Sequence, residues 1–175
     1  MSEPPTIRPA TPADLPQIQA IYAHHVVHGL ASFEEVPPDV EEMRRRFATL
    51  TEAGFPYLVA EVEGRVLGYS YCGPYRPRPA YRFSVENSVY LAPEAGRRGI
   101  GRRLLETLIE RATALGKRQM VAVIGDSANH ASIGLHTALG FRIVGKVEGA
   151  GFKHGRWVDS VLMQRPLGPG ASTPP

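Results

Sequence analysis

The amino-acid sequence predicts an α/β fold, and three observations support this. Residues 84–91 alternate in character, with Val85 and Asn87 on one face and Glu86 on the other, which is typical of a strand. Residues 100–115 repeat apolar side chains at helical spacing. Residues 119–124 form a nearly continuous apolar run, as expected in the middle of a sheet that is covered on both faces.

The chain before this central region predicts two helices and three strands. They are an edge strand, two helices and the two strands of a hairpin, at residues 6–9, 11–27, 39–50, 57–62 and 65–72. Thr11 is a helix-capping residue type, and Pro12 suits the first position of a helix. Glu63 and Gly64 form a two-residue connection that is typical of a β-hairpin.

The C-terminal part predicts one more helix and two more strands. Asn129 caps the helix, which presents Asn129, Ser132 and His136 on one face. The strands are expected at residues 141–146 and 157–164, joined by the glycine-rich segment EGAGFKHGR. The final segment GPGASTPP lacks apolar content, so we expect one domain over residues 1–167 and a disordered tail over residues 168–175.

Composition excludes several classes of protein. The net charge is only +3, which fits an anionic ligand better than a nucleic acid. Cys72 is the single cysteine, so no internal disulfide is possible. No apolar run is long enough to span a membrane, and we expect a cytoplasmic protein without membrane contact. Three histidines, at 24, 25 and 28, lack the carboxylate or cysteine neighbours of a metal site, so no metal is expected.

The segment between the strand at 84–91 and the helix at 100–115 is a candidate site for a diphosphate. It passes through Gly99 and Gly101 into the start of a helix, where unpaired N–H groups and the helix dipole favour an anion. Four arginines surround it, at positions 97, 98, 102 and 103. An ordinary glycine turn beside a solvated basic face would give the same pattern.

Two motifs carry a resemblance to a known family. Residues 97–102, RRGIGR, are similar to the (Gln/Arg)-x-x-Gly-x-(Gly/Ala) signature of the GCN5-related N-acetyltransferases (GNAT), and residues 129–141 resemble their second coenzyme A helix, which ends in Leu-Gly-Phe. Three longer stretches resemble the phosphinothricin and methionine sulfoximine acetyltransferase branch, and the likeness covers roughly residues 6–167. It implies a mixed, mostly antiparallel sheet of about seven strands with about four helices, acetyl-coenzyme A as co-substrate, and a homodimer.

The resemblance also implies roles for individual residues. It assigns coenzyme binding to Val89, Tyr90, Leu91, Gly96, Arg97, Arg98, Gly99, Ile100, Gly101, Arg102, Asn129 and Ser132. It implies an acceptor pocket bordered by Phe33 and Glu34, with Lys153 reaching over it from the last hairpin. From position alone, Phe33 could equally be a plug beside an exposed acid, and Lys153 could lie in an ordinary polar turn.

A stiff loop over residues 73–82 adds further acceptor candidates. Its three prolines disfavour strand pairing, and Arg76 or Arg82 could bind a carboxylate. Tyr75 and Val85 complete the residues that we expect to contact the acceptor. A rigid surface loop without a ligand is the alternative.

Two side chains are candidates for proton transfer. A protonated amine cannot attack a thioester, and Glu86, a carboxylate within an apolar strand, is the candidate base. Burial would raise its pKa towards the working range, although a structural glutamate paired with Arg82 is the alternative. His136 stands where many relatives carry a tyrosine acid, so it could protonate the leaving thiolate or simply pack within its helix.

The resulting hypothesis is an acetyl-coenzyme A-dependent N-acetyltransferase for the α-amine of a small amino acid analogue. Acetylation of a protein N-terminus or of another small amine is an alternative within the same class. A non-catalytic coenzyme A sensor and a basic nucleic-acid module built on residues 97–103 are the alternatives outside it.

Overall fold

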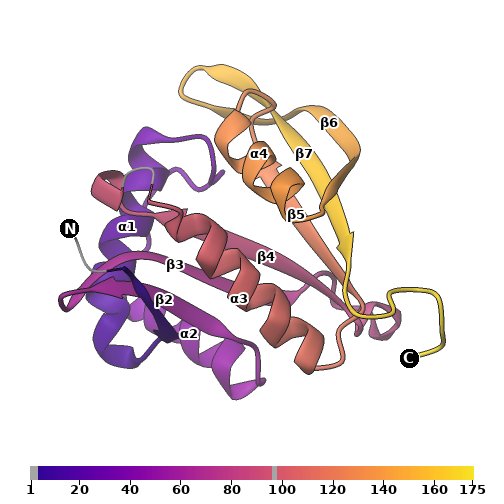
Figure 1. Cartoon of the computed structure of the whole chain (residues 1–175). Coiled ribbons are helices and arrows are strands. Elements are labelled where there is room, and N and C mark those ends of the chain that lie inside the picture. The colour runs from indigo at the N-terminus through magenta and orange to yellow at the C-terminus, as the bar shows by residue number, and fades with distance from the viewer. Residues whose placement is uncertain (1–3, 96–97) are drawn as a thin grey trace.

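The computed structural model describes residues 4–95 and 98–175, which form a central sheet between two layers of helices (Figure 1). Helices α1 and α2 cover one face, and α3 and α4 cover the other. The elements in chain order are β1 (Thr6–Pro9), α1 (Leu15–His28), α2 (Val40–Glu52), β2 (Tyr57–Val62), β3 (Arg65–Pro74), β4 (Ser84–Leu91), α3 (Ile100–Ala114), β5 (Gln119–Gly125), α4 (His130–Ala138), β6 (Arg142–Lys153) and β7 (Arg156–Pro166).

The sheet confirms the expected architecture. Its strand order is β1-β2-β3-β4-β5-β7-β6, and β1 lies at an edge as predicted. Every neighbouring pair is antiparallel except β4 and β5, which are parallel because α3 carries the chain back across the sheet. The one parallel pair therefore lies in the middle of the sheet.

The predicted caps and turns are present. Glu63 and Gly64 both have positive φ angles, of 48° and 77°, which suit the tight turn between β2 and β3. The Asn129 side chain accepts a hydrogen bond from the Ser132 N–H at 3.1 Å and so begins α4. A three-residue 3-10 turn, Pro12–Asp14, precedes α1, and its Asp14 carboxylate accepts from the Thr11 N–H at 2.7 Å.

Two predicted loops are partly strand. The glycine-rich segment before residue 154 belongs to β6, so the β6–β7 hairpin is longer than expected and turns only at His154 and Gly155. Pairing uses main-chain groups, which glycines supply as other residues do, and the irregular register between Val147 and Gly151 accommodates them. Strand β3 extends to Pro74, where a strand end requires no further N–H donor.

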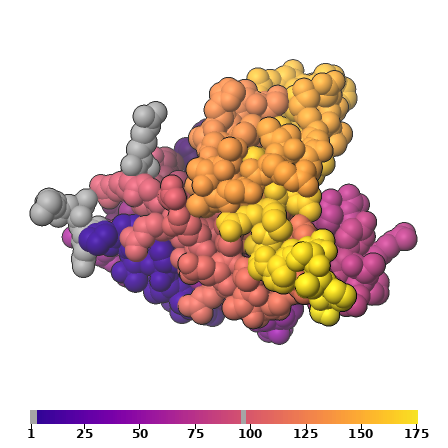
Figure 2. Space-filling model, turned by 45° about the vertical axis from the view of Figure 1, so that its right-hand side comes forward, coloured from indigo at the N-terminus to yellow at the C-terminus, as the bar shows by residue number. Residues whose placement is uncertain are grey.

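The last eight residues, for which the composition predicts disorder, lie on the surface of the molecule (yellow in Figure 2). Arg118 donates hydrogen bonds to the carbonyl oxygens of Gly170 and Pro174 and to the Thr173 hydroxyl. These hydrogen bonds to Arg118 hold the segment, which has little apolar surface to bury.

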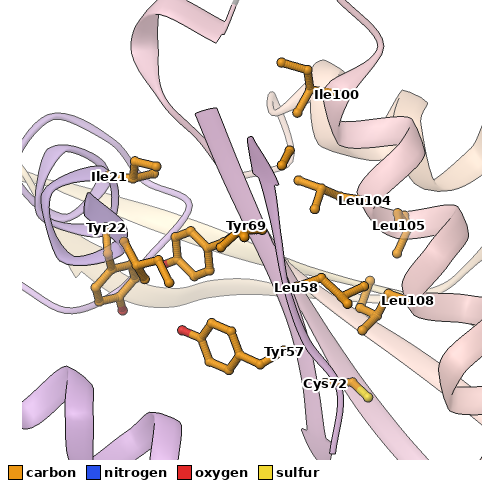
Figure 3. Close-up of a cluster of buried hydrophobic side chains, with 14 of the residues drawn as sticks. Ile21, Tyr22, Tyr57, Leu58, Tyr69, Cys72, Ile100, Leu104, Leu105 and Leu108 are labelled. Carbon is orange, nitrogen blue, oxygen red and sulfur yellow. The ribbon is translucent and has the colours of Figure 1, made fainter. Parts of the chain in front are cut away.

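The two faces of the sheet have different cores (Figure 3). Tyr57, Tyr69 and Tyr22 pack between the sheet and helices α1 and α2. On the other face the leucines of α3 are fully buried against Leu58 and Cys72. Helices and sheet are therefore held by burial on both sides, which keeps the central strands in place.

Candidate active site

Strands β4 and β5 separate halfway along their length. They pair only from Ser84 and Gln119 to Asn87 and Ala122. Beyond this point β4 stays with β3 as far as Leu91, whereas β5 stays with β7 as far as Gly125. Figure 1 shows α4 and the β6–β7 hairpin on the β5 side of this split, and Figure 2 shows them as a lobe that stands out from the rest.

A cavity of about 50 Å³ lies in this split. It is lined by Ala31, Asn87, Ser88, Val89, Tyr90, Ala122, Val123, Ile124, Gly125, Asn129, Ser132 and His136. The structure thus brings together five residues that the sequence analysis expected at the site from two distant segments. Side chains of α4 form one wall of the cavity, and the end of β5 forms another. The half of β4 that pairs with β3 but not with β5 forms the third.

His136 is buried in the wall of this cavity, with both ring nitrogens in hydrogen-bond range of oxygen atoms. Nδ1 lies 2.8 Å from the Ser132 carbonyl oxygen, and Nε2 lies 3.0 Å from Asn87 Oδ1. The Asn87 amide also donates to the Val121 carbonyl oxygen at 3.1 Å. Burial lowers the pKa of His136. Asn87 was not a predicted site residue.

Helix α3 begins at the mouth of the split, with open space beside Gly99. Gly99, at the N-cap of the helix, adopts a left-handed conformation with a φ of 69°, offers no side-chain cap of its own, and has no atom within 4 Å of where a Cβ would lie. Gly96 and Arg97, both expected in the diphosphate site, lie outside the described residues. Arg98 is exposed beside Gly99. Unpaired N–H groups at an uncapped helix start fit an anionic group.

Other residues of this segment have different uses. Gly101 is buried, and a Cβ there would contact Leu135 and Leu91 at 3.4 Å, so this glycine serves close packing between α3, α4 and β4. Ile100 is buried in the core. The two arginines that follow are already paired, Arg102 with Glu106 at 2.8 Å and Arg103 with the Pro5 carbonyl at 2.6 Å.

Glu86 lies on the opposite face of β4, toward α1 and α2, and is half-buried. Its register partner on β3 is Gly73, which has no side chain to cover it. Burial raises the pKa of Glu86, and the charge of Arg76 partly opposes this rise. Arg82 instead donates to the Pro79 carbonyl oxygen and lies over the Phe83 ring, so the alternative of a structural Arg82–Glu86 pair is not found.

The loop between α1 and α2 lies beside this face. Glu34 accepts hydrogen bonds from Arg46 at 2.6 Å and from the Tyr22 hydroxyl at 2.7 Å. The pKa of Glu34 is lowered, chiefly by Arg46, so this carboxylate is a fixed anion. Arg46 and Tyr22 also line a cavity of about 40 Å³ together with tyrosines of β2 and β3. Sequence reasoning missed Arg46 because it belongs to an ordinary run of arginines on α2.

Phe33 and Lys153 join the same loop to the β6–β7 hairpin. The Lys153 ammonium is buried and donates to the Ser32 carbonyl oxygen at 2.6 Å, and burial lowers its pKa. A Cβ at Gly151 would lie 2.8 Å from the Phe33 ring, so the ring packs directly on the hairpin main chain. Lys153 therefore fastens the loop, a use that the sequence did not indicate.

The remaining acceptor candidates separate into two groups. Tyr75 packs edge-on against Tyr81, and Arg76 lies over the Tyr75 ring, so both belong to the loop next to Glu86. Val85 is fully buried on the opposite face of β4, and the structure gives it a packing role in place of the expected acceptor contact.

Within residues 4–95 and 98–175, no cluster of three metal-ligating side chains occurs. In the same part of the chain, no helix has both the length and the apolar character that crossing a bilayer requires. His25 instead hydrogen-bonds the Leu91 carbonyl oxygen at 2.8 Å, at the end of β4.

The sheet thus opens between two parallel strands, and helix α3 begins at the mouth of the opening. Comparison with known proteins gives the class of this enzyme, an acetyltransferase. A model of the acetyltransferase (GNAT) domain matches residues 7–162. The chain therefore belongs to the GNAT acetyltransferase family, as the sequence motifs indicated.

Individual relatives agree. A phosphinothricin N-acetyltransferase of Alcaligenes faecalis is 58% identical over 97% of this chain and 86% of its own length. An L-methionine sulfoximine/L-methionine sulfone acetyltransferase of Pseudomonas aeruginosa is 45% identical over 97% of this chain and 98% of its own. The crystal structure of a GNAT phosphinothricin acetyltransferase from Sinorhizobium meliloti with acetyl-coenzyme A superposes with a TM-score of 0.95, at 52% identity, covering 99% of this chain and 94% of that one.

Proposed function

We propose that this enzyme transfers an acetyl group from acetyl-coenzyme A to the α-amine of a small amino acid analogue similar to phosphinothricin or methionine sulfoximine. The observation that carries the proposal is the split between β4 and β5, with Glu86 half-buried on the adjoining face of β4. The names of the relatives support the same substrate class.

On the donor side, the residues present fit acetyl-coenzyme A. The uncapped start of α3 at Gly99, with the exposed Arg98, would hold the diphosphate. Asn129 and Ser132 would contact the arm of the coenzyme from α4, and the half of β4 without a β5 partner would offer main-chain groups along it. The coenzyme supplies an activated acetyl thioester.

On the acceptor side, Glu86 removes the proton that prevents the amine from attacking. A raised pKa brings a carboxyl group closer to the pKa of the amine, which makes it a better base. The negative charge that develops on the thioester oxygen meets main-chain N–H groups in the Val89–Leu91 half of β4. Burial there strengthens such hydrogen bonds.

The acceptor's own anionic group requires a cation near Glu86. Arg76 meets this requirement because its charge acts on Glu86 and its side chain is exposed. Phe33, Glu34 and Tyr75 would shape the pocket, and Lys153 would keep the Phe33 loop in position. Arg82 remains a weaker candidate, since it lies over Phe83.

A panel of acceptors with acetyl-coenzyme A, followed by thiol release, tests this function. We expect turnover with phosphinothricin and methionine sulfoximine, and values of kcat/KM at least about 100-fold lower with a polyamine and with a peptide N-terminus, because an exposed arginine repels a polycation. Faster turnover of the peptide would favour the N-terminal alternative. Binding of acetyl-coenzyme A in calorimetry without thiol release would favour a non-catalytic sensor.

The β6–β7 hairpin supports a homodimer. Large apolar side chains are exposed on it and on the adjacent β5, namely Val123, Ile143, Val144, Val147, Phe152 and Trp157. Trp157 is 71% exposed and packs edge-on against the exposed Phe152, and large exposed apolar side chains that lie together are typical of a protein interface. A second copy of this chain would cover it. Sedimentation equilibrium should give twice the mass of the chain, and a monomer at all concentrations would refute the dimer.

A further inference from the structure

Asn87 stands at the point where β4 and β5 separate. It is the last residue of β4 that pairs with β5, and its side chain is buried. Its Nδ2 donates to the Val121 carbonyl oxygen at 3.1 Å, so a side-chain amide contacts the main chain of β5 where the main-chain ladder stops. The Oδ1 atom of the same side chain lies 3.0 Å from His136 Nε2. Asn87 thus connects β4, β5 and α4 at the base of the split.

The hydrogen bonds through Asn87 and His136 form a chain with a carbonyl oxygen at each end. Val121 O requires a donor from Asn87, which leaves Asn87 Oδ1 as an acceptor toward His136. His136 Nδ1 lies 2.8 Å from the Ser132 carbonyl oxygen, which can only accept, so this short contact needs an N–H on Nδ1. A neutral imidazole has only one N–H, so the complete chain requires His136 to carry a proton on both nitrogens.

Among the described residues, none of those that contact His136 is charged. From α4 it meets Ser132, from β4 it meets Asn87, and from the segment after α4 it meets the Phe141 ring edge-on. Glu86 is the nearest acid along β4, but alternation places it on the other face. The Ser132 hydroxyl is 3.5 Å from Nδ1, which is too long to compete with the carbonyl. Burial alone opposes the extra proton.

We propose that Asn87 is a positioning residue that ends β4–β5 pairing at the cleft and holds His136 as a doubly protonated imidazolium facing the acyl donor. This inference rests on the proposed function, because the leaving thiolate of that reaction is the anion that the cation would meet. The cation then stabilises a leaving thiolate, and Nε2–H supplies its proton after leaving the Asn87 Oδ1 acceptor, while Nδ1–H stays on the Ser132 carbonyl oxygen. The imidazolium becomes neutral imidazole, the thiolate becomes a thiol, and His136 recovers a proton from solvent in the next cycle.

Two substitutions change the network in opposite directions. Asn87→Leu is close in size and removes both hydrogen bonds, whereas Asn87→Asp keeps an acceptor for His136 and adds a negative charge. We expect the acid dissociation constant of His136 to rise about tenfold with leucine and to fall about tenfold with aspartate, since one hydrogen bond is worth about one pH unit. Nitrogen NMR of the ring, with the free enzyme, measures both without relying on activity.

The kinetic readout should follow the same order. The alkaline limb of kcat against pH should move to lower pH with leucine and to higher pH with aspartate, and KM for acetyl-coenzyme A should increase about tenfold with leucine because the cleft loses its brace. Gln164→Leu is a matched control. It removes a side-chain amide bond to Gln119 of β5 at 2.8 Å, away from the split, and should leave the His136 titration and KM unchanged.

Several outcomes would overturn the proposal. A lower melting temperature with an unchanged His136 titration would mean that Asn87 is only structural. If Asn87→Leu does not fold, the wild-type spectrum still decides, because a neutral imidazole at about pH 6, with either ring nitrogen bare, contradicts the doubly protonated chain. Calorimetry of the wild type with acetyl-coenzyme A keeps the two proposals apart, since absence of binding rejects the proposed function while the titration still tests Asn87.

Discussion

Replacing Glu86 by glutamine removes the proposed base and preserves the size of the side chain. A positioned general base contributes about 10²- to 10⁴-fold to a rate, which corresponds to about 3 to 5 kcal/mol of activation free energy. Glu86 is half-buried and its pKa is raised, so both geometry and basicity favour the upper part of this range. We therefore expect kcat to fall about 10³- to 10⁴-fold.

The pH dependence gives a second, independent readout. The basic form of Glu86 is lost as the pH falls through its raised pKa, so the acid limb of the wild-type profile should lie above the usual value of 4.5. In the glutamine variant this limb should disappear. Its residual rate should instead rise about tenfold per pH unit below the pKa of the acceptor amine, because only the unprotonated amine reacts.

The rate of thiol release measures catalysis, and calorimetry with acetyl-coenzyme A measures binding, so the two assays together separate these effects. The affinity for the coenzyme should remain at the wild-type value. Glu110→Gln, which removes the same charge from an exposed position on the outer face of α3, should leave kcat unchanged. A Glu86→Gln enzyme with normal coenzyme affinity and kcat within about twofold of the wild type would refute Glu86 as the base.

Two further predictions concern the scaffold. Arg8 lowers the pKa of Asp14 to about 2, so Asp14→Asn should reduce the free energy of unfolding by about 2 kcal/mol at neutral pH. Urea unfolding should show this difference above pH 4 and lose it as the pH falls to about 2, and a constant difference would contradict the ion pair. Gly125→Ala would place a Cβ 2.1 Å from the Leu30 carbonyl oxygen, so the melting temperature should fall and KM for the acceptor should rise. Gly134→Ala on α4, where no atom lies within 4 Å of the new Cβ, should be neutral or stabilising, and equal effects of the two changes would contradict the steric argument.

Local patterns predicted most of the fold. Alternation identified the strand that carries Glu86, the apolar stripe identified α3, and Asn129 marked the start of α4, because each signal depends on neighbours in the chain. The extent of the β6–β7 hairpin was not predictable in this way. Its glycines read as a loop, whereas their pairing depends on a partner strand that only the folded sheet supplies.

The site was predictable to the extent that it lies in contiguous motifs. The coenzyme segments could be recognised as motifs, whereas the contact between Asn87 and His136 joins residues 49 positions apart and leaves no local pattern. The same holds for Lys153 and Ser32, which are 121 positions apart. For the arginines near Gly101 the local pattern indicated too much. The basic run predicts that all four bind an anion, whereas Arg103 donates to the Pro5 carbonyl oxygen.

The main chain packed around the Phe33 ring limits which substitutions at position 33 the fold can accept. Bare main chain borders the ring at two places, since a Cβ at Gly125 would lie 3.1 Å from it and a Cβ at Gly151 would lie 2.8 Å from it. On these two sides no side chain can give way, so a larger ring at position 33 would have to extend toward the solvent, where 41% of Phe33 is exposed. If Phe33 borders the acceptor, as proposed, a smaller side chain would widen the pocket without disturbing either strand. We therefore expect changes at this residue to broaden the substrate range more readily than to narrow it.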